Sequence, residues 1–230
     1  MYIRKASLRN VRSISEMDWA VQEGEEAGWH VILGDNGSGK SSFLRALALG
    51  LVGPRNAEAL RLDWNEWITR GTHSATIQLQ VGWDTGDLFS GSGNVPRNRA
   101  LSAGLELRLQ NGKVQVNGIP KSGLPLRGIW GSSEGWFSAS YGPFRRFAGG
   151  DAEFASLSYS RPKLAAHLSL FGENYALTEA LRWLQDLDYR RKDNRPEGRL
   201  LDGLIGFVNN SGLLPKHVRV VGGRNIGQSG

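Results

Sequence analysis

Eight consecutive residues near the N-terminus combine glycines, a lysine and a hydroxyl group at a spacing that suits phosphate binding. The run matches the pattern of glycine, any four residues, glycine, lysine and serine or threonine, and it reads Gly34-Asp35-Asn36-Gly37-Ser38-Gly39-Lys40-Ser41. Glycines allow a tight turn whose backbone N–H groups point at phosphate oxygens. A lysine in this place puts a charge near the β- and γ-phosphates, and the next hydroxyl is a candidate Mg²⁺ ligand. The motif predicts a nucleotide-binding loop with Lys40 as its cation and Ser41 as its metal ligand.

The segments on either side of this loop are those that a phosphate-binding loop needs. Residues 29–33, Trp-His-Val-Ile-Leu, form an apolar, β-prone run that predicts a buried strand. Residues 43–49 are strong helix formers, and Gly50 and Gly53 offer a stop. A chance match remains an alternative because the chain contains 31 glycines. The order of strand, loop and helix favours nucleotide binding, and the helix start adds its positive dipole end.

Composition places the chain among ordinary globular proteins. Hydrophobic residues make up 40% and charged residues 22% of 230 positions, enough for one large domain or two small ones. The absence of cysteine excludes disulfides and thiolate metal sites, and four histidines argue against a histidine-rich metal centre. No apolar run approaches the about 18–20 residues that span a bilayer, and the N-terminus has no signal-peptide core. We expect a cytoplasmic protein with no membrane partner.

The net charge of +6 permits nucleic acid as a partner without demonstrating it. Basic residues gather at residues 143–146 and 189–192, and Arg195 and Arg199 follow. One interpretation is a surface that follows the phosphates of DNA. The other is a solvated helix end whose arginines pair with neighbouring acids. Such acids are present at Asp186, Asp188 and Asp193.

The remaining pattern is β-rich first and helical later. Strands are expected at 2–9, 14–19, 75–83, 105–109, 114–116, 136–141 and 217–221, with an Asn111-Gly112 hairpin turn. Residues 54–71 look irregular or weakly helical, and 86–103 and 118–135 look loop-like. Amphipathic helices are expected at 176–188 and 197–210, with Thr178 near the first start. The predicted fold class is α/β.

The other motifs of phosphate-binding-loop proteins are missing from the sequence. No Asn-Lys-x-Asp run is present to recognise guanine. A hydrolytic ATPase needs an apolar strand ending in a carboxylate that holds Mg²⁺, and neither candidate segment supplies one. Residues 184–188 follow a helical pattern, and residues 218–221 run into glycines without an acid. No catalytic residue can therefore be named.

The order of these elements resembles the start of an ABC-type ATPase head of the RecF, SMC and SbcC branch. In that branch a first strand leads to an Asn-Phe-Arg/Lys-Ser turn, and here Asn10-Val11-Arg12-Ser13 has valine at the aromatic position. The family loop Gly-x-Asn-Gly-x-Gly-Lys-Ser matches residues 34–41 position by position. Residues 141–146, Tyr-Gly-Pro-Phe-Arg-Arg, are similar to a segment of some RecF-like ATPases. The resemblance covers residues 1–50 and 136–221.

The resemblance implies roles for individual residues. Arg12 and Ser13 would lie beside the bound nucleotide, and Asn36 would face the γ-phosphate side. Ser42 would bind the α-phosphate. For Arg12 an exposed turn cation, and for Asn36 a simple turn preference, are the alternatives. The cofactors implied are ATP and Mg²⁺.

The chain departs from the family at its other end. Such heads carry a signature helix opening with Leu-Ser-Gly/Asp-Gly, followed by an acidic strand. Residues 200–203, Leu-Leu-Asp-Gly, lack the serine, and no acidic strand follows. We therefore expect a P-loop NTPase fold, as the N-terminal lobe of an ABC-type head, that is incomplete. It would be one nucleotide-binding domain over 1–230, with a meander, loop and helix (1–53), a β-rich insertion (54–145) and a helical part (146–230).

Three hypotheses follow for function. The first is an ATP·Mg²⁺-binding lobe of a RecF/SMC-like ATPase of DNA repair or phage defence, which dimerises or joins a complementing C-terminal lobe on binding ATP. DNA would be a further partner. The second is a nucleotide-binding scaffold without turnover. The third, a small-molecule kinase, is disfavoured because no lid with clustered Arg and Asp follows the loop.

Overall fold

The computed structural model describes residues 1–83, 86–88, 100–121, 123–131, 136–143, 157, 160–172 and 178–221. The chain divides into two compact units, each described by itself below. Unit 1 comprises Met1–Pro143 and Ser156–Gly172, and unit 2 comprises Phe144–Ala155 and Glu173–Gly230. Compactness does not decide whether both belong to one nucleotide-binding domain, so the single-domain expectation stays a prediction.

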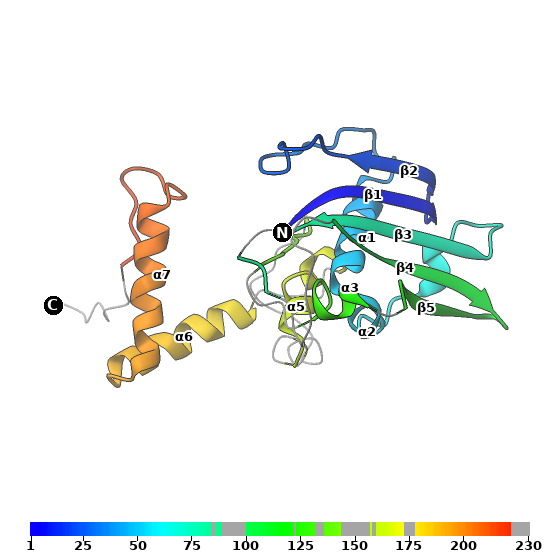
Figure 1. Cartoon of the computed structure of the whole chain (residues 1–230). Helices are drawn as coiled ribbons and strands as arrows, with labels where there is room; N and C mark the ends of the chain where they lie inside the picture. The colour runs from blue at the N-terminus through cyan, green and yellow to red at the C-terminus, as the bar shows by residue number, and fades with distance from the viewer. Residues whose placement is uncertain are drawn as a thin grey trace. The chain divides into compact units, whose positions relative to one another are not determined.

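Unit 1 is built on a five-stranded antiparallel sheet with the strand order β2-β1-β3-β4-β5 (Figure 1). The strands are β1 (Tyr2–Val11), β2 (Ile14–Ala20), β3 (Ser74–Gly82), β4 (Leu101–Gln110) and β5 (Lys113–Ile119). Along the central strand β3 alternate residues are buried, as the period-two pattern requires. The buried positions of the central strand β3 are Ala75, Ile77, Leu79 and Val81, each at most 1% exposed. The mixed α/β class with an antiparallel sheet is thus confirmed.

The hairpin between β4 and β5 turns where the sequence predicts. Asn111 and Gly112 have φ values of 51° and 75°, the left-handed region that a two-residue hairpin turn requires. Strand β4 starts at Leu101, so its first residues are strand although we expected loop up to residue 103. They extend the strand because they pair with the end of β3, a partner that lies far away in the sequence.

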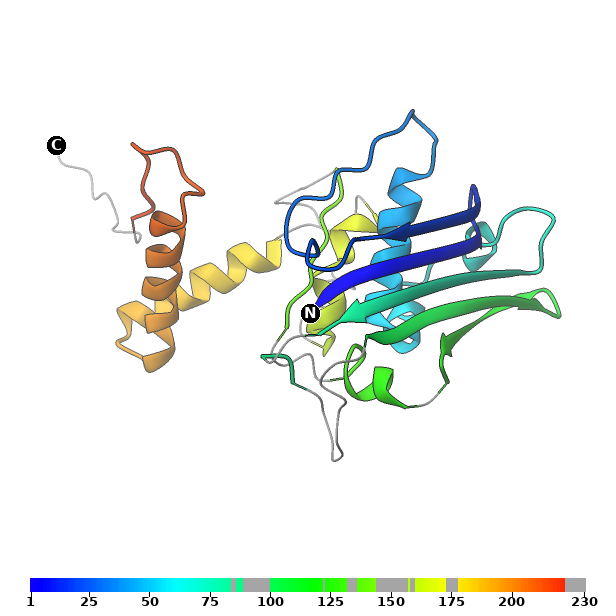
Figure 2. The same ribbon diagram turned by 45° about the horizontal axis from the view of Figure 1, so that its top comes forward.

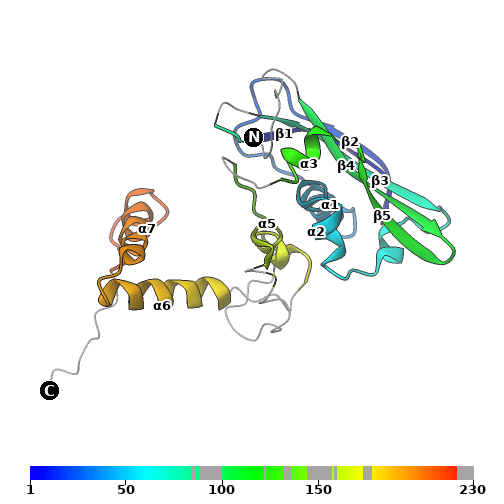
Figure 3. The same ribbon diagram turned by 60° about the horizontal axis from the view of Figure 1, so that its bottom comes forward.

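Helix α1 (Lys40–Val52) packs its apolar side on the sheet (Figure 3). Gly50 lies inside this helix and does not end it. A Cβ at Gly50 would stand 2.6 Å from Cδ1 of Leu79, so the missing side chain lets helix and sheet approach closely. Gly53 ends the helix, with φ 79°, and its N–H bonds to the carbonyl of Leu49.

Short segments complete unit 1. They are α2 (Pro54–Glu58), η1 (Trp64–Trp67), α3 (Leu124–Arg127), α5 (Pro162–Ala165) and η2 (Leu168–Leu170). The prediction of weak helix over 54–71 is confirmed by α2 and η1, with Trp67 and Ile68 buried. Residues 136–141, expected as a strand, belong to none of the five strands. Their segment bonds instead to the residues around α5, for example from the N–H of Ser140 to the carbonyl of Ala166 (3.0 Å).

The described part of unit 2 contains α6 (Thr178–Lys192), η3 (Pro196–Gly198) and α7 (Arg199–Asn210). Both long helices were predicted from their three- and four-residue spacing. The strand expected at 217–221 is not formed. Instead the side-chain amide of Asn209 makes two bonds to the backbone of Val220, of 2.8 and 2.9 Å, in the place of a neighbouring strand.

Candidate functional site

The predicted phosphate-binding loop joins the sheet to the start of α1. Gly37 and Gly39 have φ values of 84° and 95°, which glycine adopts without strain. Ser38 donates its N–H to the carbonyl of Asp35, forming a tight turn, and Gly39 precedes the first helical residue. The loop therefore has the conformation that brings successive N–H groups to the N-terminus of a helix.

Two glycines of the loop are also required by space. A Cβ at Gly39 would lie 3.0 Å from the side chain of Ile14 and 3.4 Å from Oγ of Ser13. A Cβ at Gly34 would lie 2.7 Å from Oγ of Ser38. A side chain at either position would require Ser38 or Ile14 to shift, so glycine suits both places.

Lys40 closes the loop into a ring. Its Nζ donates to the carbonyl of Gly34 at 2.6 Å and to that of Asp35 at 2.7 Å. These bonds tie the first residue of α1 to the first two residues of the loop and hold the ammonium group over it. A charge held in this position can pair with the terminal phosphates of a nucleotide.

The turn of Arg12 and Ser13 lies beside the loop, since a Cβ placed on Gly39 would be 3.4 Å from Oγ of Ser13. Arg12 has φ 55°, and its N–H bonds to the carbonyl of Trp67 while Thr69 donates its hydroxyl to the carbonyl of Arg12. Its guanidinium lies 5.5 Å from the ring centre of Trp67. The turn is thus anchored by backbone bonds and by a cation–π contact.

Arg45 is a further cation at this site, one that the sequence analysis did not select. It projects from α1 and donates Nε to the carbonyl of Leu170 at 2.9 Å. Burial, and then the charge of Arg12, lower the pKa of Arg45. The signal in the sequence was an arginine inside the otherwise apolar run of residues 43–49.

The remaining predicted residues have been located, but their roles stay predictions. Asp35, Asn36, Ser38 and Ser41 are exposed, and Ser42 is half-buried. Ser41 lies in the first turn of α1, where a metal-binding hydroxyl is required. Among the described residues, no group of three or more His, Asp or Glu could hold a metal ion.

The strand predicted just before the loop is not formed, and this is a correction. Figure 2 shows the segment between β2 and α1 as an open loop outside the sheet edge. Trp29 is 99%, Val31 77% and Leu33 87% exposed. One aromatic contact joins this segment to β2: the ring of His30 lies edge-on to the ring of Trp19, with 5.8 Å between the ring centres. An apolar run becomes a buried strand only when another strand pairs with it and a second layer covers it.

The described arginines of the basic cluster pair with local acids. Arg190 bonds to Asp186 at 2.7 Å, Lys192 to Asp188 at 2.7 Å, and Arg195 to Asp193 at 2.6 Å. Arg191 joins the two helices of unit 2, bonding to Asp188 and to Asp202. These contacts favour the helix-end interpretation of residues 189–195 over a DNA surface. Arg145 and Arg146 lie outside the described residues.

No protein-family model matches the chain. In sequence it is 32% identical over 83 residues to the Septu protein PtuA of Bacillus mycoides (strain KBAB4). That match covers 35% of this chain and 12% of the relative, so the chain corresponds to a small part of that protein.

Two solved structures are similar as well. One is an SMC ATPase from a study of ATP-driven dimerization and DNA-stimulated activation. It is 20% identical in sequence, the match covers 51% of this chain and 68% of that chain, and the TM-score is 0.38. The other is the recombination mediator RecF with ATP, which is 15% identical in sequence. That match covers 92% of this chain and 46% of the RecF chain, and the TM-score is 0.35. No helix among the described residues is both long and apolar enough to cross a membrane.

Proposed function

We propose that this chain binds ATP·Mg²⁺ through residues 34–42 as the N-terminal lobe of a RecF/SMC-like ATPase of DNA repair or phage defence. The observation that carries the proposal is the closed loop, in which Lys40 is held over two glycine-dependent turns at the start of α1. Arg12 belongs to the turn next to the loop, and Arg45 of α1 is a second cation near Arg12. Backbone N–H groups bind the phosphates, and Lys40 neutralises the terminal ones.

Hydrolysis requires groups that a second lobe or a partner chain supplies. The sequence holds no apolar strand that ends in a carboxylate, and the metal ion supplies charge stabilisation only when its ligands are complete. The exposed apolar segment 29–33 is where such a lobe docks, because its side chains lack cover on the described unit. ATP then acts as the joint between this loop and the partner, in a homodimer or with a complementing C-terminal lobe.

The loop is tested by calorimetry with ATP and Mg²⁺. Lys40→Ala should lower the affinity at least about 100-fold, since a charge-assisted pair with phosphate contributes about 1.5–3 kcal/mol and the ring of the loop opens as well. Lys113→Ala, at an exposed position in the β4–β5 hairpin, is the matched control and should bind as the unchanged chain does. Equal affinities for all three proteins would refute the proposal.

The metal ligand is tested separately. Ser41→Ala should weaken ATP binding about tenfold in Mg²⁺, because one ligand of the ion is lost. In the presence of EDTA the variant and the unchanged chain should bind ATP equally. A loss of the same size in both buffers would assign Ser41 to the loop structure and not to the metal.

A further inference from the structure

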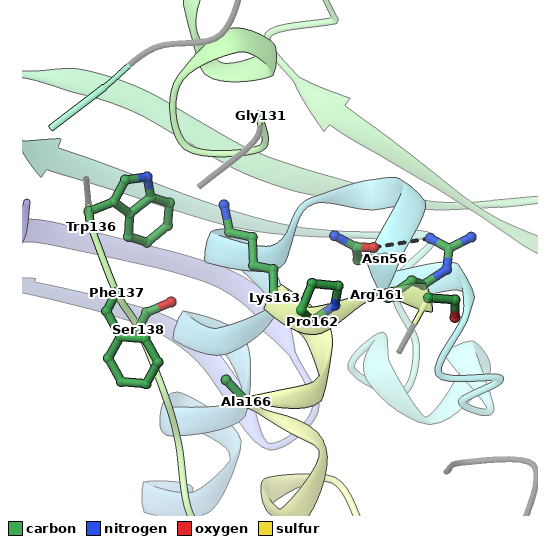
Figure 4. A pocket seen from close by; sticks show the side chains of 10 residues that line it. Asn56, Gly131, Trp136, Phe137, Ser138, Arg161, Pro162, Lys163 and Ala166 are labelled. Carbon is green, nitrogen blue, oxygen red and sulfur yellow. Dashed lines mark hydrogen bonds between the residues drawn. The ribbon is translucent and has the colours of Figure 1, made fainter. Parts of the chain in front are cut away.

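A second cavity of unit 1 lies away from the phosphate-binding loop, and no residue of 34–42 lines it. Its volume is about 650 Å³, within the range of small-ligand sites. Its walls come from α2, from the segment 136–138 and from α5 (Figure 4). The residues that carry the argument are Asn56, Trp136, Phe137, Arg161 and Lys163.

The charged groups of this cavity are both cations. Arg161 donates Nη1 to the carbonyl of Arg55 and to Oδ1 of Asn56, each at 3.0 Å. Lys163 places Nζ 4.0 Å from the ring centre of Trp136. No carboxylate is present among the described lining residues. The charged side chains of the described lining therefore favour an anion.

Lys163 is poorly satisfied as it stands. Its Nζ is shielded from solvent and has no hydrogen-bond partner among the described residues, although an ammonium group carries three donors. Burial lowers the pKa of Lys163 to about 7. The other titratable groups near it are Arg161 and His167, and burial followed by the charge of Lys163 lowers the pKa of His167 to about 4. An acidic group entering the cavity would supply what Lys163 lacks.

The wall opposite these cations is aromatic. Phe137 lines the cavity and yet is 81% exposed, so its face is open to a ligand. Its neighbour Trp136 presents its ring to Lys163, and Pro162 lies between the two cations along the wall (Figure 4). An exposed aromatic face beside a desolvated cation suits a ligand that has both a flat ring and an acidic group.

We propose that this cavity binds a small organic anion in which a carboxylate, sulfonate or phosphate group is attached to an aromatic ring. The acidic group pairs with Lys163, with Arg161 adding charge, and the ring packs on Phe137. The site is independent of ATP binding, because its residues and those of the loop do not overlap.

The first experiment uses benzenesulfonate as the probe and a Lys40→Ala background, which removes binding by the loop. We expect a Kd of about 1 mM or tighter by calorimetry, as suits a ligand of this size. Methanesulfonate and benzyl alcohol, which each carry one half of the probe, should bind at least about tenfold more weakly. Lys163→Gln and Phe137→Ala should each weaken benzenesulfonate about tenfold, and Lys113→Gln should not change it. Phe137 is exposed, so that variant keeps its fold even if Lys163→Gln does not.

The second experiment counts protons. Benzenesulfonate does not titrate near neutral pH, so calorimetry in two buffers of different ionisation enthalpy reports the protein alone. Because the bound anion favours the charged form of Lys163, we expect an uptake of about 0.5–1 proton per ligand at pH 8 and close to none at pH 6. The uptake should vanish in Lys163→Gln or, if that variant is unfolded, in Lys163→Met. Absence of binding at about 10 mM probe, or binding without proton uptake at pH 8, would overturn the proposal.

Discussion

At the scale of single residues, His167 is the buried polar group of unit 1 whose protonation state is best defined. Ser138 and Ser140 lie within hydrogen-bond distance of its two ring nitrogens, at 3.0 and 2.8 Å. Burial and the charge of Lys163 lower its pKa to about 4, so the ring is neutral in the folded chain at pH 7. The two serines belong to the segment 136–142, which His167 thereby fastens to the residues after α5.

This arrangement predicts a loss of stability in acid. The unfolded chain binds a proton at His167 near pH 6.5, and the folded chain does so only near pH 4. The stabilisation is complete above pH 6.5 and is lost as the pH falls from 6.5 to 4. We expect about 2 kcal/mol of the free energy of unfolding to be lost between pH 7 and pH 5 through this group alone. Urea denaturation of the unchanged chain and of His167→Gln at both pH values measures it.

The comparison depends on the slope with pH and not on the absolute stability, because His167→Gln also alters the hydrogen bonds. The exposed His73→Gln serves as the control and should keep the full dependence on pH. If His167→Gln lost as much stability in acid as the unchanged chain, carboxylates elsewhere would be responsible.

At the scale of elements, the sequence pattern of residues 29–33 and their observed structure disagree. Its pattern is that of a buried strand, while the structure leaves Trp29, Val31 and Leu33 exposed. The helix α1 and the strands β1 and β3 form without it, since their own side chains supply the core beneath. The segment is therefore an apolar surface on the described unit and a strand only when a further layer joins.

Identical substitutions at two valines test this. Val31→Ser should change the free energy of unfolding of the chain by less than about 0.5 kcal/mol, as exposed sites do. Val81→Ser, at a residue of β3 that is 1% exposed, should cost about 2–3 kcal/mol. Equal losses at both sites would mean that residues 29–33 are buried in the chain by itself. Light scattering should also show weaker self-association for Val31→Ser, because the apolar surface is reduced.

At the scale of the whole molecule, the two compact units differ in the features that they contain. Unit 1 holds the loop, its cations and the second cavity, while the described part of unit 2 consists of two helices joined by ion pairs of Arg191. The sequence pattern does not indicate the catalytic carboxylate of an ATPase, and no acidic cluster among the described residues supplies one.

We therefore expect the 230-residue chain to bind ATP but to hydrolyse it at a rate close to the uncatalysed background. Electrostatic positioning supplies most of the acceleration of phosphoryl transfer, and the groups that orient water are missing. A phosphate-release assay on the purified chain, with Lys40→Ala as the control for contaminating ATPases, measures this. Turnover of about one per second or faster that Lys40→Ala abolishes would show that an acidic site exists within the chain.

Much of the fold and of the candidate loop is determined by the sequence alone, because local rules act there. Alternation of apolar residues set β1 and β3, Asn111-Gly112 set the hairpin turn, and three- and four-residue spacing set α6 and α7. The residue types at positions 34–41 similarly predict a phosphate-binding loop, since glycine, lysine and serine act there through backbone shape and charge.

Tertiary structure decided what depends on partners distant in the chain. Residues 29–33 and 217–221 have strand-like sequences, but a strand exists only where another backbone offers hydrogen bonds. At Val220 the side-chain amide of Asn209 bonds to the backbone N–H and carbonyl instead. Gly50 lies inside the helix, and the missing Cβ lets α1 approach Leu79 of the sheet closely. Folding brings Arg45 near Arg12, whose charge lowers the pKa of Arg45. It also brings Nζ of Lys163 over the ring of Trp136. Burial and charge pairing arise from the packing of distant segments, and no local pattern contains them.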